Sequence, residues 1–140
     1  MENIHSTSVE LDGKAVLIKG KSGSGKSSVA LSLIMLGCNL IADDQTVVFL
    51  EKDQVKLRAP ESLPCGLEIR GVGFVRAPIC KQAELKLVVD LSKYEKKRFP
   101  NPDERSTNIL GYSFPFYFFQ GIKEPANAIY AVVKFGKMDM

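Results

Sequence analysis

The sequence predicts one α/β domain, residues 1–140, with a mixed and largely antiparallel sheet and few helices. The first observation behind this prediction is that hairpin signals outnumber strand–helix–strand units along the chain. The second is one stretch of helical apolar spacing that directly follows a glycine-rich loop. The third is composition, because 45% hydrophobic and 25% charged residues are close to globular averages and exclude disordered or collagen-like chains.

The N-terminal part of the chain predicts a hairpin, a loop and a helix. Residues 8–19 read as two strands joined by the Asp12-Gly13 turn, the second strand being apolar enough for a buried position. Residues 20–25 contain three glycines, which neither a strand nor a helix interior favours. Residues 27–36 then place apolar side chains at helical spacing. Gly37 follows as the residue that ends this helix in a left-handed conformation.

The middle of the chain predicts further strands. Residues 40–42 form a short apolar strand that ends in two acids, Asp43 and Asp44. Residues 46–58 read as a second hairpin with its turn at Asp53-Gln54. Residues 67–70 and 85–91 predict two more strands.

The C-terminal part of the chain gives weaker signals. Residues 92–108 are polar and charged, and we expect a surface segment that is either a docking loop or a solvated linker. The aromatic run at 112–119 resumes the core. Residues 127–135 predict either a closing strand or a short terminal helix, which periodicity does not separate.

The net charge and the spacing of the cysteines exclude several classes of protein. A net charge of +3 suits anionic ligands but falls short of a nucleic-acid-binding protein. Cys38, Cys65 and Cys80 form no C-x-x-C pair, so we expect free thiols in a reducing cytoplasm. The N-terminus has no secretion signal, and the apolar stretches are too short to span a bilayer. We therefore expect a cytoplasmic protein that binds neither membranes nor nucleic acid.

One motif points directly to chemistry. Its eight residues fit G-x-x-x-x-G-K-[ST] at every fixed position: Gly20, Lys21, Ser22, Gly23, Ser24, Gly25, Lys26 and Ser27. Such glycines let backbone N–H groups converge on a polyphosphate at the start of a helix, so we expect a P-loop that binds ATP. Lys26 supplies a positive charge for the phosphates, and the Ser27 hydroxyl is placed for Mg²⁺. The alternative is a mere glycine-rich turn, which an apolar strand before it and a helix after it disfavour.

Acids near the loop, and the only histidine, are the other candidates. Asp43 and Asp44 lie one short strand beyond the helix and point in different directions, so they can take separate roles, as metal ligand or base, or else form a turn. Without further context His5 reads as structural more readily than catalytic. Glu68 and Arg70 share one face of a strand, where an internal ion pair is the alternative to function.

Together these features resemble a known family. The segments that carry the resemblance occur in one order: His5, Gly13, the P-loop, Leu40-Ile41-Ala42-Asp43-Asp44 and Leu67-Glu68-Ile69-Arg70-Gly71-Val72-Gly73. They resemble the C-terminal catalytic domain of HPr kinase/phosphorylase across residues 5–91. The resemblance implies a phosphoenolpyruvate carboxykinase-like P-loop fold. It also implies a bacterial enzyme that phosphorylates a serine of HPr, the phosphocarrier of the sugar phosphotransferase system, and removes that phosphate by phosphorolysis.

The resemblance also implies roles for residues and cofactors. The phosphoryl donor would be ATP or pyrophosphate, with Lys26 as the phosphate-binding lysine and Ser27 and Glu68 as Mg²⁺ ligands. Asp44 would accept the serine proton beside an active-site histidine, His5. Arg98 matches a catalytic arginine.

The chain departs from the family pattern in several places. It resembles short forms that lack the N-terminal domain of long relatives, and the usual glycine-rich insert between Gly73 and Leu85 is missing. The family's P-G-R-N becomes Pro125-Ala126-Asn127, so an arginine of the family is lost near Ala126. Long relatives are hexamers, so a homo-oligomer is an open expectation. Two alternative functions remain, another P-loop small-molecule kinase or NTPase, and a nucleotide-sensing module without catalysis.

Overall fold

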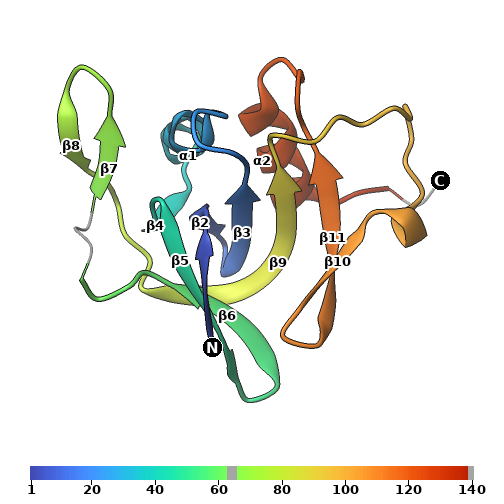
Figure 1. Cartoon of the computed structure of the whole chain (residues 1–140), viewed down its shortest axis with the longest axis horizontal. Coiled ribbons are helices and arrows are strands. Elements are labelled where there is room, and N and C mark those ends of the chain that lie inside the picture. The colour runs from blue at the N-terminus through green and yellow to red at the C-terminus, as the bar shows by residue number, and fades with distance from the viewer. Residues whose placement is uncertain (63–65, 139–140) are drawn as a thin grey trace.

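The computed structural model describes residues 1–62 and 66–138. Most of the described residues belong to one curved sheet of nine strands with a helix pair beside it, and a separate two-stranded hairpin stands apart at one end (Figure 1). The strands of the large sheet are β1 (Glu2–His5), β2 (Thr7–Leu11), β3 (Lys14–Lys19), β4 (Asn39–Ala42), β5 (Gln45–Glu51), β6 (Gln54–Arg58), β9 (Gln82–Asp90), β10 (Ser106–Ile109) and β11 (Tyr112–Phe118). The separate hairpin is β7 (Gly66–Ile69) and β8 (Gly73–Arg76).

The sheet is mixed, as predicted. Its main path runs β1-β5-β6-β9-β3-β2-β4, and β11 pairs with both β9 and β10. The central pair β3–β9 and the pair β9–β11 are parallel, whereas the other pairs, including the predicted hairpins β2–β3 and β5–β6, are antiparallel. The prediction of a mixed, largely antiparallel sheet is therefore confirmed.

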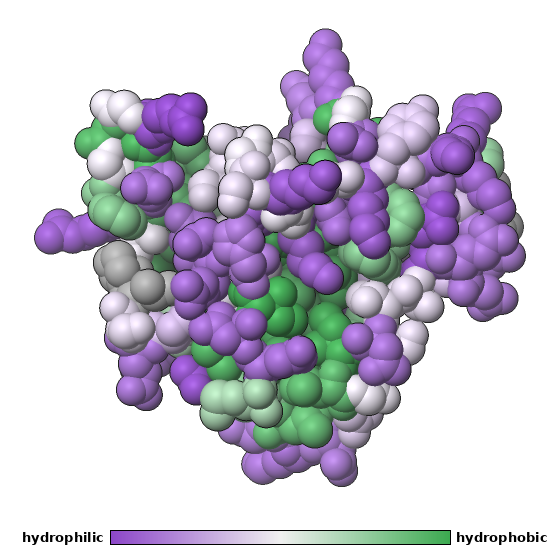
Figure 2. All heavy atoms as spheres, in the orientation of Figure 1, coloured by the Kyte–Doolittle hydropathy of each residue, from purple (hydrophilic) through white to green (hydrophobic). Residues whose placement is uncertain are grey.

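Two helices cover one face of the sheet. Helix α1 (Lys26–Met35) and helix α2 (Pro125–Phe135) pack on each other and on the apolar side chains of β2, β3 and β9. Because side chains alternate along a strand, Val16 and Ile18 of β3 face the helices, while Leu17 faces a second core on the other side. Figure 2 shows apolar side chains at the middle of one molecular face, between hydrophilic margins. The central strand is thus buried on both faces and fixes the loop that follows it.

The open question about the C-terminal segment has a clear answer. Residues 125–135 form a helix, because Ala126, Ile129 and Val133 fall on one buried face at helical spacing. Pro125 occupies the first turn, where its missing N–H costs no helical hydrogen bond. The predicted helix end at Gly37 is also confirmed, with φ 116° at that glycine.

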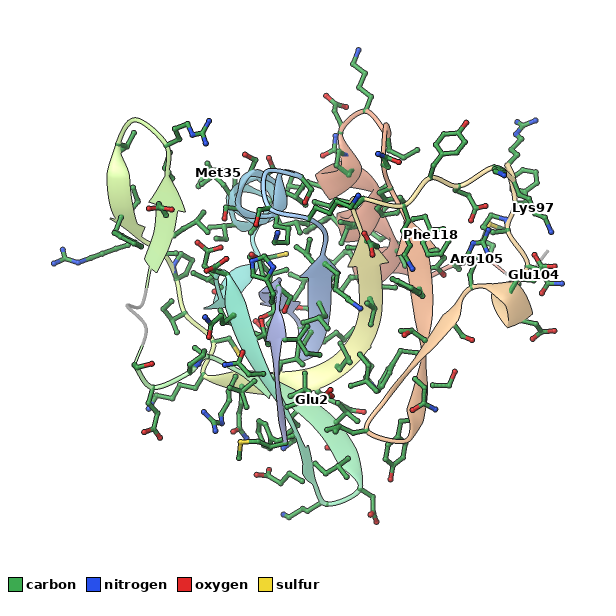
Figure 3. All side chains as sticks on the ribbon, viewed as in Figure 1. Glu2, Met35, Lys97, Glu104, Arg105 and Phe118 are labelled. Carbon is green, nitrogen blue, oxygen red and sulfur yellow. The ribbon has the colours of Figure 1, made fainter. Side chains whose placement is uncertain are left out.

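The charged segment before β10 is anchored to the body of the protein. Arg105 donates to both carboxylate oxygens of Glu95, at 2.5 and 2.8 Å, and Lys97 pairs with Glu104 at 2.7 Å (Figure 3). The Arg105 guanidinium holds the pKa of Glu95 down, at about 2. A short 3₁₀ helix, η1 (Pro102–Glu104), leads into β10. The segment is therefore held by bidentate and single ion pairs rather than being a loose linker.

Helices long and apolar enough to cross a membrane are absent from the described part of the chain. Cys38 is a buried free thiol and Cys80 is a half-buried one, as the sequence led us to expect. Cys65 lies outside the described residues.

Candidate functional site

Most of the predicted site residues meet in one open cleft. The cleft has a volume of about 780 Å³ and lies between the loop before α1, the ends of β1 and β4, and the β7–β8 hairpin. Side chains from all of these elements line it, among them His5, Lys26, Ser27, Asp44 and Glu68. The cleft thus joins segments that are far apart in the sequence.

The glycine-rich loop has a geometry suited to an anion. Gly25 precedes α1 with φ 99°, and the first intrahelical bond runs from Val29 N–H to Gly25 O, at 2.9 Å. The N–H groups before Val29 are therefore free of helical bonds, and no side chain among the described residues caps them. Lys26, only 7% exposed, folds back so that Nζ donates to Gly20 O at 2.9 Å. A helix start with free N–H donors and an adjacent ammonium group favours a polyphosphate.

Glycine is required at the start of the loop. A Cβ atom at Gly20 would collide with Ser24 Oγ, which itself is buried without a hydrogen-bond partner in the described structure. The same end of the loop is braced from β9: Lys21 N–H donates to Ser92 Oγ at 2.7 Å, and Ser92 N–H donates to Asp90 Oδ1 at 2.8 Å. Sequence reasoning missed Ser92, because it lies 71 residues beyond its partner.

The first of the two acids is tied to the loop serine. Ser27 Oγ donates to Asp43 Oδ1 at 2.8 Å, and Thr7 Oγ1 donates to the same oxygen at 3.0 Å. The other carboxylate oxygen of Asp43 faces the N–H of Glu68 at 3.4 Å. Asp43, rather than the Glu68 carboxylate, is thus the acid in direct contact with Ser27.

The second acid is tied to the histidine. His5 Nε2 lies 2.9 Å from Asp44 Oδ1, and the two side chains are 50% and 70% exposed, so the pair faces the open cleft. Pairing of β1 with β5 creates this contact, since His5 lies opposite Gln45 and Ser6 N–H donates to Asp44 O at 3.1 Å. Asp44 itself has φ 72°, a left-handed conformation that is unusual outside glycine. The structure therefore directs the two adjacent carboxylates to different partners.

Of three other candidate residues, two line the cleft and one does not. Glu68 and Arg70 line the cleft from the β7–β8 hairpin, and the described residues contain no ion pair between them. Arg98 is not among the residues that line the cleft; its guanidinium lies 5.2 Å from the centre of the exposed Phe99 ring. The structure thus brings Glu68 to the candidate site and leaves Arg98 outside it.

The donor set suits a magnesium ion that arrives with a nucleotide. Ser27 Oγ and Asp43 Oδ1 are adjacent oxygen donors, with Glu68 on the facing hairpin. Nowhere in residues 1–62 and 66–138 do three or more His, Cys, Asp or Glu side chains gather as a metal cage. Mg²⁺ typically takes one or two carboxylates plus phosphate oxygens and water, so these residues fit it better than a metal held by protein alone.

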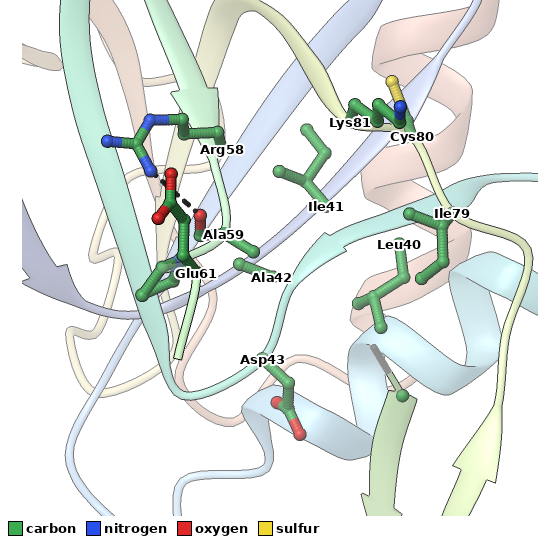
Figure 4. A pocket seen from close by; sticks show the side chains of 12 residues that line it. Leu40, Ile41, Ala42, Asp43, Arg58, Ala59, Glu61, Ile79, Cys80 and Lys81 are labelled. Carbon is green, nitrogen blue, oxygen red and sulfur yellow. Dashed lines mark hydrogen bonds between the residues drawn. The ribbon is translucent and has the colours of Figure 1, made fainter. Parts of the chain in front are cut away.

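A smaller pocket of about 280 Å³ lies behind β4 (Figure 4). Leu40, Ile41 and Ile79 give it an apolar wall, and Arg58 stands at its margin. Figure 4 shows the Asp43 side chain pointing away from this wall. Asp43 lines this smaller pocket as well, and it accepts a hydrogen bond from Ser27, which lines the larger cleft.

Comparison with known proteins gives a consistent set of matches. Residues 1–117 match the family described as the HPr Serine kinase C-terminal domain. The HPr kinase/phosphorylase of Pediococcus pentosaceus is 37% identical over 103 residues, covering 68% of this chain and 33% of the relative. That of Chlorobium chlorochromatii is 36% identical over 130 residues, covering 81% of this chain and 38% of the relative.

A solved structure has the same overall fold. The Hpr(Ser) kinase/phosphatase from Coxiella burnetii matches with a TM-score of 0.81 and 26% identity, over 96% of this chain and 89% of that chain. The chain spans about a third of the length of the curated relatives first matched.

Proposed function

Because the chain belongs to the HPr serine kinase C-terminal domain family, we propose that it transfers a phosphoryl group from ATP to a serine of HPr. The observation that carries the proposal is one cleft lined by the phosphate-binding loop, by Ser27, whose hydroxyl donates to Asp43, and by the His5–Asp44 pair. The fold would be the phosphoenolpyruvate carboxykinase-like kind of P-loop fold.

The nucleotide would lie along the loop at residues 20–27. Free N–H groups at the start of α1 would bind the phosphate oxygens, and Lys26 would turn from Gly20 O to the β and γ phosphates. Ser27 and Asp43 would hold Mg²⁺ from one side, with Glu68 approaching from the hairpin. When bound, Mg²⁺ would neutralise charge on the transferred group. Pyrophosphate, which carries the same phosphate chemistry, is a second candidate donor.

The acceptor serine would meet Asp44. A serine hydroxyl is a weak nucleophile, and a carboxylate within hydrogen-bond reach orients it and takes its proton during transfer. His5, 2.9 Å from Asp44 Oδ1, would keep that carboxylate aimed into the cleft. Both side chains are half exposed or more, which leaves room for a serine on the surface of another protein.

The same groups would serve the reverse direction. Inorganic phosphate on the loop would attack the phosphorus of phosphoserine, so that the bond from phosphorus to the serine oxygen breaks and pyrophosphate forms. Asp44, in its protonated form, would give its proton to the leaving serine oxygen. Arg98 lies outside the cleft, and we propose no step for it.

The proposal is tested by incubating the chain with γ-labelled ATP, Mg²⁺ and HPr, with an HPr whose acceptor serine is changed to alanine as control. Label on wild-type HPr alone is the expected result. Labelled metabolites without labelled HPr would favour a small-molecule kinase. Tight ATP binding with no transfer to any acceptor would favour a nucleotide-sensing module.

A further inference from the structure

The Thr7 hydroxyl contacts both of the adjacent acidic residues, Asp43 and Asp44. Thr7 Oγ1 donates to Asp43 Oδ1 at 3.0 Å and lies 3.4 Å from Asp44 N, whose N–H points to it. A hydroxyl has one donor and two acceptor positions, so it can serve both contacts at once. The Thr7 side chain lines the cleft but is fully buried, at 0% exposure.

Thr7 acts where the backbone ladder stops. The β2–β4 ladder ends at the pair Ser8–Ala42, and the chain then turns away through Asp43 and Asp44. Beyond that pair, the turn is held by the Thr7 side chain at the start of β2 and by the preceding Ser6 N–H, which donates to Asp44 O at 3.1 Å. The hydroxyl thus takes the place of the next ladder hydrogen bond at the point where the acids must be aimed.

Two donors fix the plane of the Asp43 carboxylate. Oδ1 accepts from both Thr7 and Ser27, while Oδ2 faces Glu68 N–H at the longer distance of 3.4 Å. Carboxylates that bind metals are commonly held by such outer hydrogen bonds, whose loss costs about 10–100-fold in metal affinity or activity. Thr7 is β-branched, so its side-chain rotamer is restricted and the hydroxyl direction is well defined.

We infer that Thr7 is a positioning residue that sets Asp43 for Mg²⁺ and, through the backbone of the same turn, Asp44 for the acceptor. The inference rests on the proposed function of the cleft. It predicts a change in how much Mg²⁺ strengthens ATP binding, and no change in ATP affinity without Mg²⁺. A purely structural threonine would instead affect folding without changing how Mg²⁺ and ATP depend on each other.

The test measures ATP affinity with and without Mg²⁺, by titration calorimetry, in the wild type and three variants. Thr7→Val removes the hydroxyl and keeps the shape, Thr7→Ser restores the hydroxyl, and Ser8→Ala removes a neighbouring buried hydroxyl that bonds Thr46 instead of the acids. Thr7→Val should reduce the gain in ATP affinity from Mg²⁺ by about tenfold or more, while metal-free binding is kept. Thr7→Ser and Ser8→Ala should stay within about threefold of the wild type on both measures.

Each outcome decides the inference. An unchanged Mg²⁺ effect in Thr7→Val overturns it, as does an equal loss in Ser8→Ala or an equal loss of metal-free binding. If Thr7→Val does not fold, Thr7→Ala is judged by the same measures. If the wild type binds Mg²⁺ and ATP but labels no HPr, only the proposed function is overturned. The comparison of Mg²⁺-dependent ATP affinity between the wild type and the Thr7 variants remains valid in that case. A wild type that binds no ATP overturns both.

Discussion

His5 Nε2 lies 2.9 Å from the Asp44 carboxylate, although 39 positions separate the two residues in the sequence. The contact exists because β1 pairs with β5, the strand that begins next to Asp44. An edge strand thus carries a side chain to the acid that we propose as the base. In our proposal, the histidine therefore acts on the reaction through this acid.

This relationship predicts a coupled loss of activity. His5→Gln should lower kcat for HPr phosphorylation by about tenfold, since the imidazole orients a base whose own contribution is about 10²–10⁴-fold. In an Asp44→Asn background the same change should add almost nothing, because its partner has gone. Steady-state kinetics of the four proteins measure the coupling. Independent, multiplying losses would mean that His5 acts on something other than Asp44.

The brace between Ser92 and Lys21 predicts an effect on nucleotide binding. Ser92→Ala removes the acceptor of Lys21 N–H, so the start of the loop loses a 2.7 Å hydrogen bond. The Kd for ATP should rise by about three- to tenfold, the usual worth of one such bond. Ser92→Thr keeps the hydroxyl and serves as the control. Equal affinity of Ser92→Ala and wild type would show that the brace is dispensable.

The ion pair of Arg105 with Glu95 predicts that the charged segment before β10 resists cleavage by trypsin. Glu95→Gln should expose Lys96, Lys97 and Arg98 to faster cleavage by trypsin, whereas Glu104→Gln, which removes only the more exposed pair, should change cleavage less. The pKa of Glu95 is lowered to about 2 by Arg105, so the pair's contribution is present above the ordinary pKa of glutamate and is lost as the pH falls toward 2. Cleavage rates that are equal in both variants would contradict this.

The buried thiol of Cys38 predicts slow alkylation of the folded protein and a loss of folding stability at alkaline pH. Burial, with the charges of Glu10 and Asp12, raises the pKa of its thiol from 9.0 to about 11. At pH 8 only about one thiol in a thousand is ionised, so iodoacetamide should label the Cys38 peptide slowly in the folded protein and readily in urea. Because the folded pKa is the higher one, stability should decline as the pH rises from about 9 toward 11. Equal labelling of folded and unfolded protein at pH 8 would refute the raised pKa.

Local chemistry explains which parts of the fold could be predicted. The glycine-rich loop, the Asp12-Gly13 turn and the helix end at Gly37 are set by short-range preferences, and the sequence revealed them. Strand β1 was missed, because Glu2–His5 shows no alternation and is held by pairing with β5. Strand β8 was missed for a similar reason, since all four of its residues are exposed.

The candidate site, too, could be predicted only where a local sequence pattern marks its residues. The motif predicted Lys26 and Ser27, but spacing alone could not say which acid meets which partner. That assignment depends on the left-handed turn at Asp44, which sends Asp43 to Ser27 and Asp44 to His5. Thr7 and Ser92 act through contacts 36 and 71 positions away, so no local pattern marks them.

We propose that Asp44 activates the acceptor serine beside a nucleotide held by the loop. The most direct test compares wild type and Asp44→Asn for phosphoryl transfer to HPr and, in parallel, for ATP affinity. We predict that Asp44→Asn binds ATP as the wild type does, yet transfers phosphate at least about a hundredfold more slowly. Undiminished transfer to the HPr serine by Asp44→Asn would show that Asp44 is not the base.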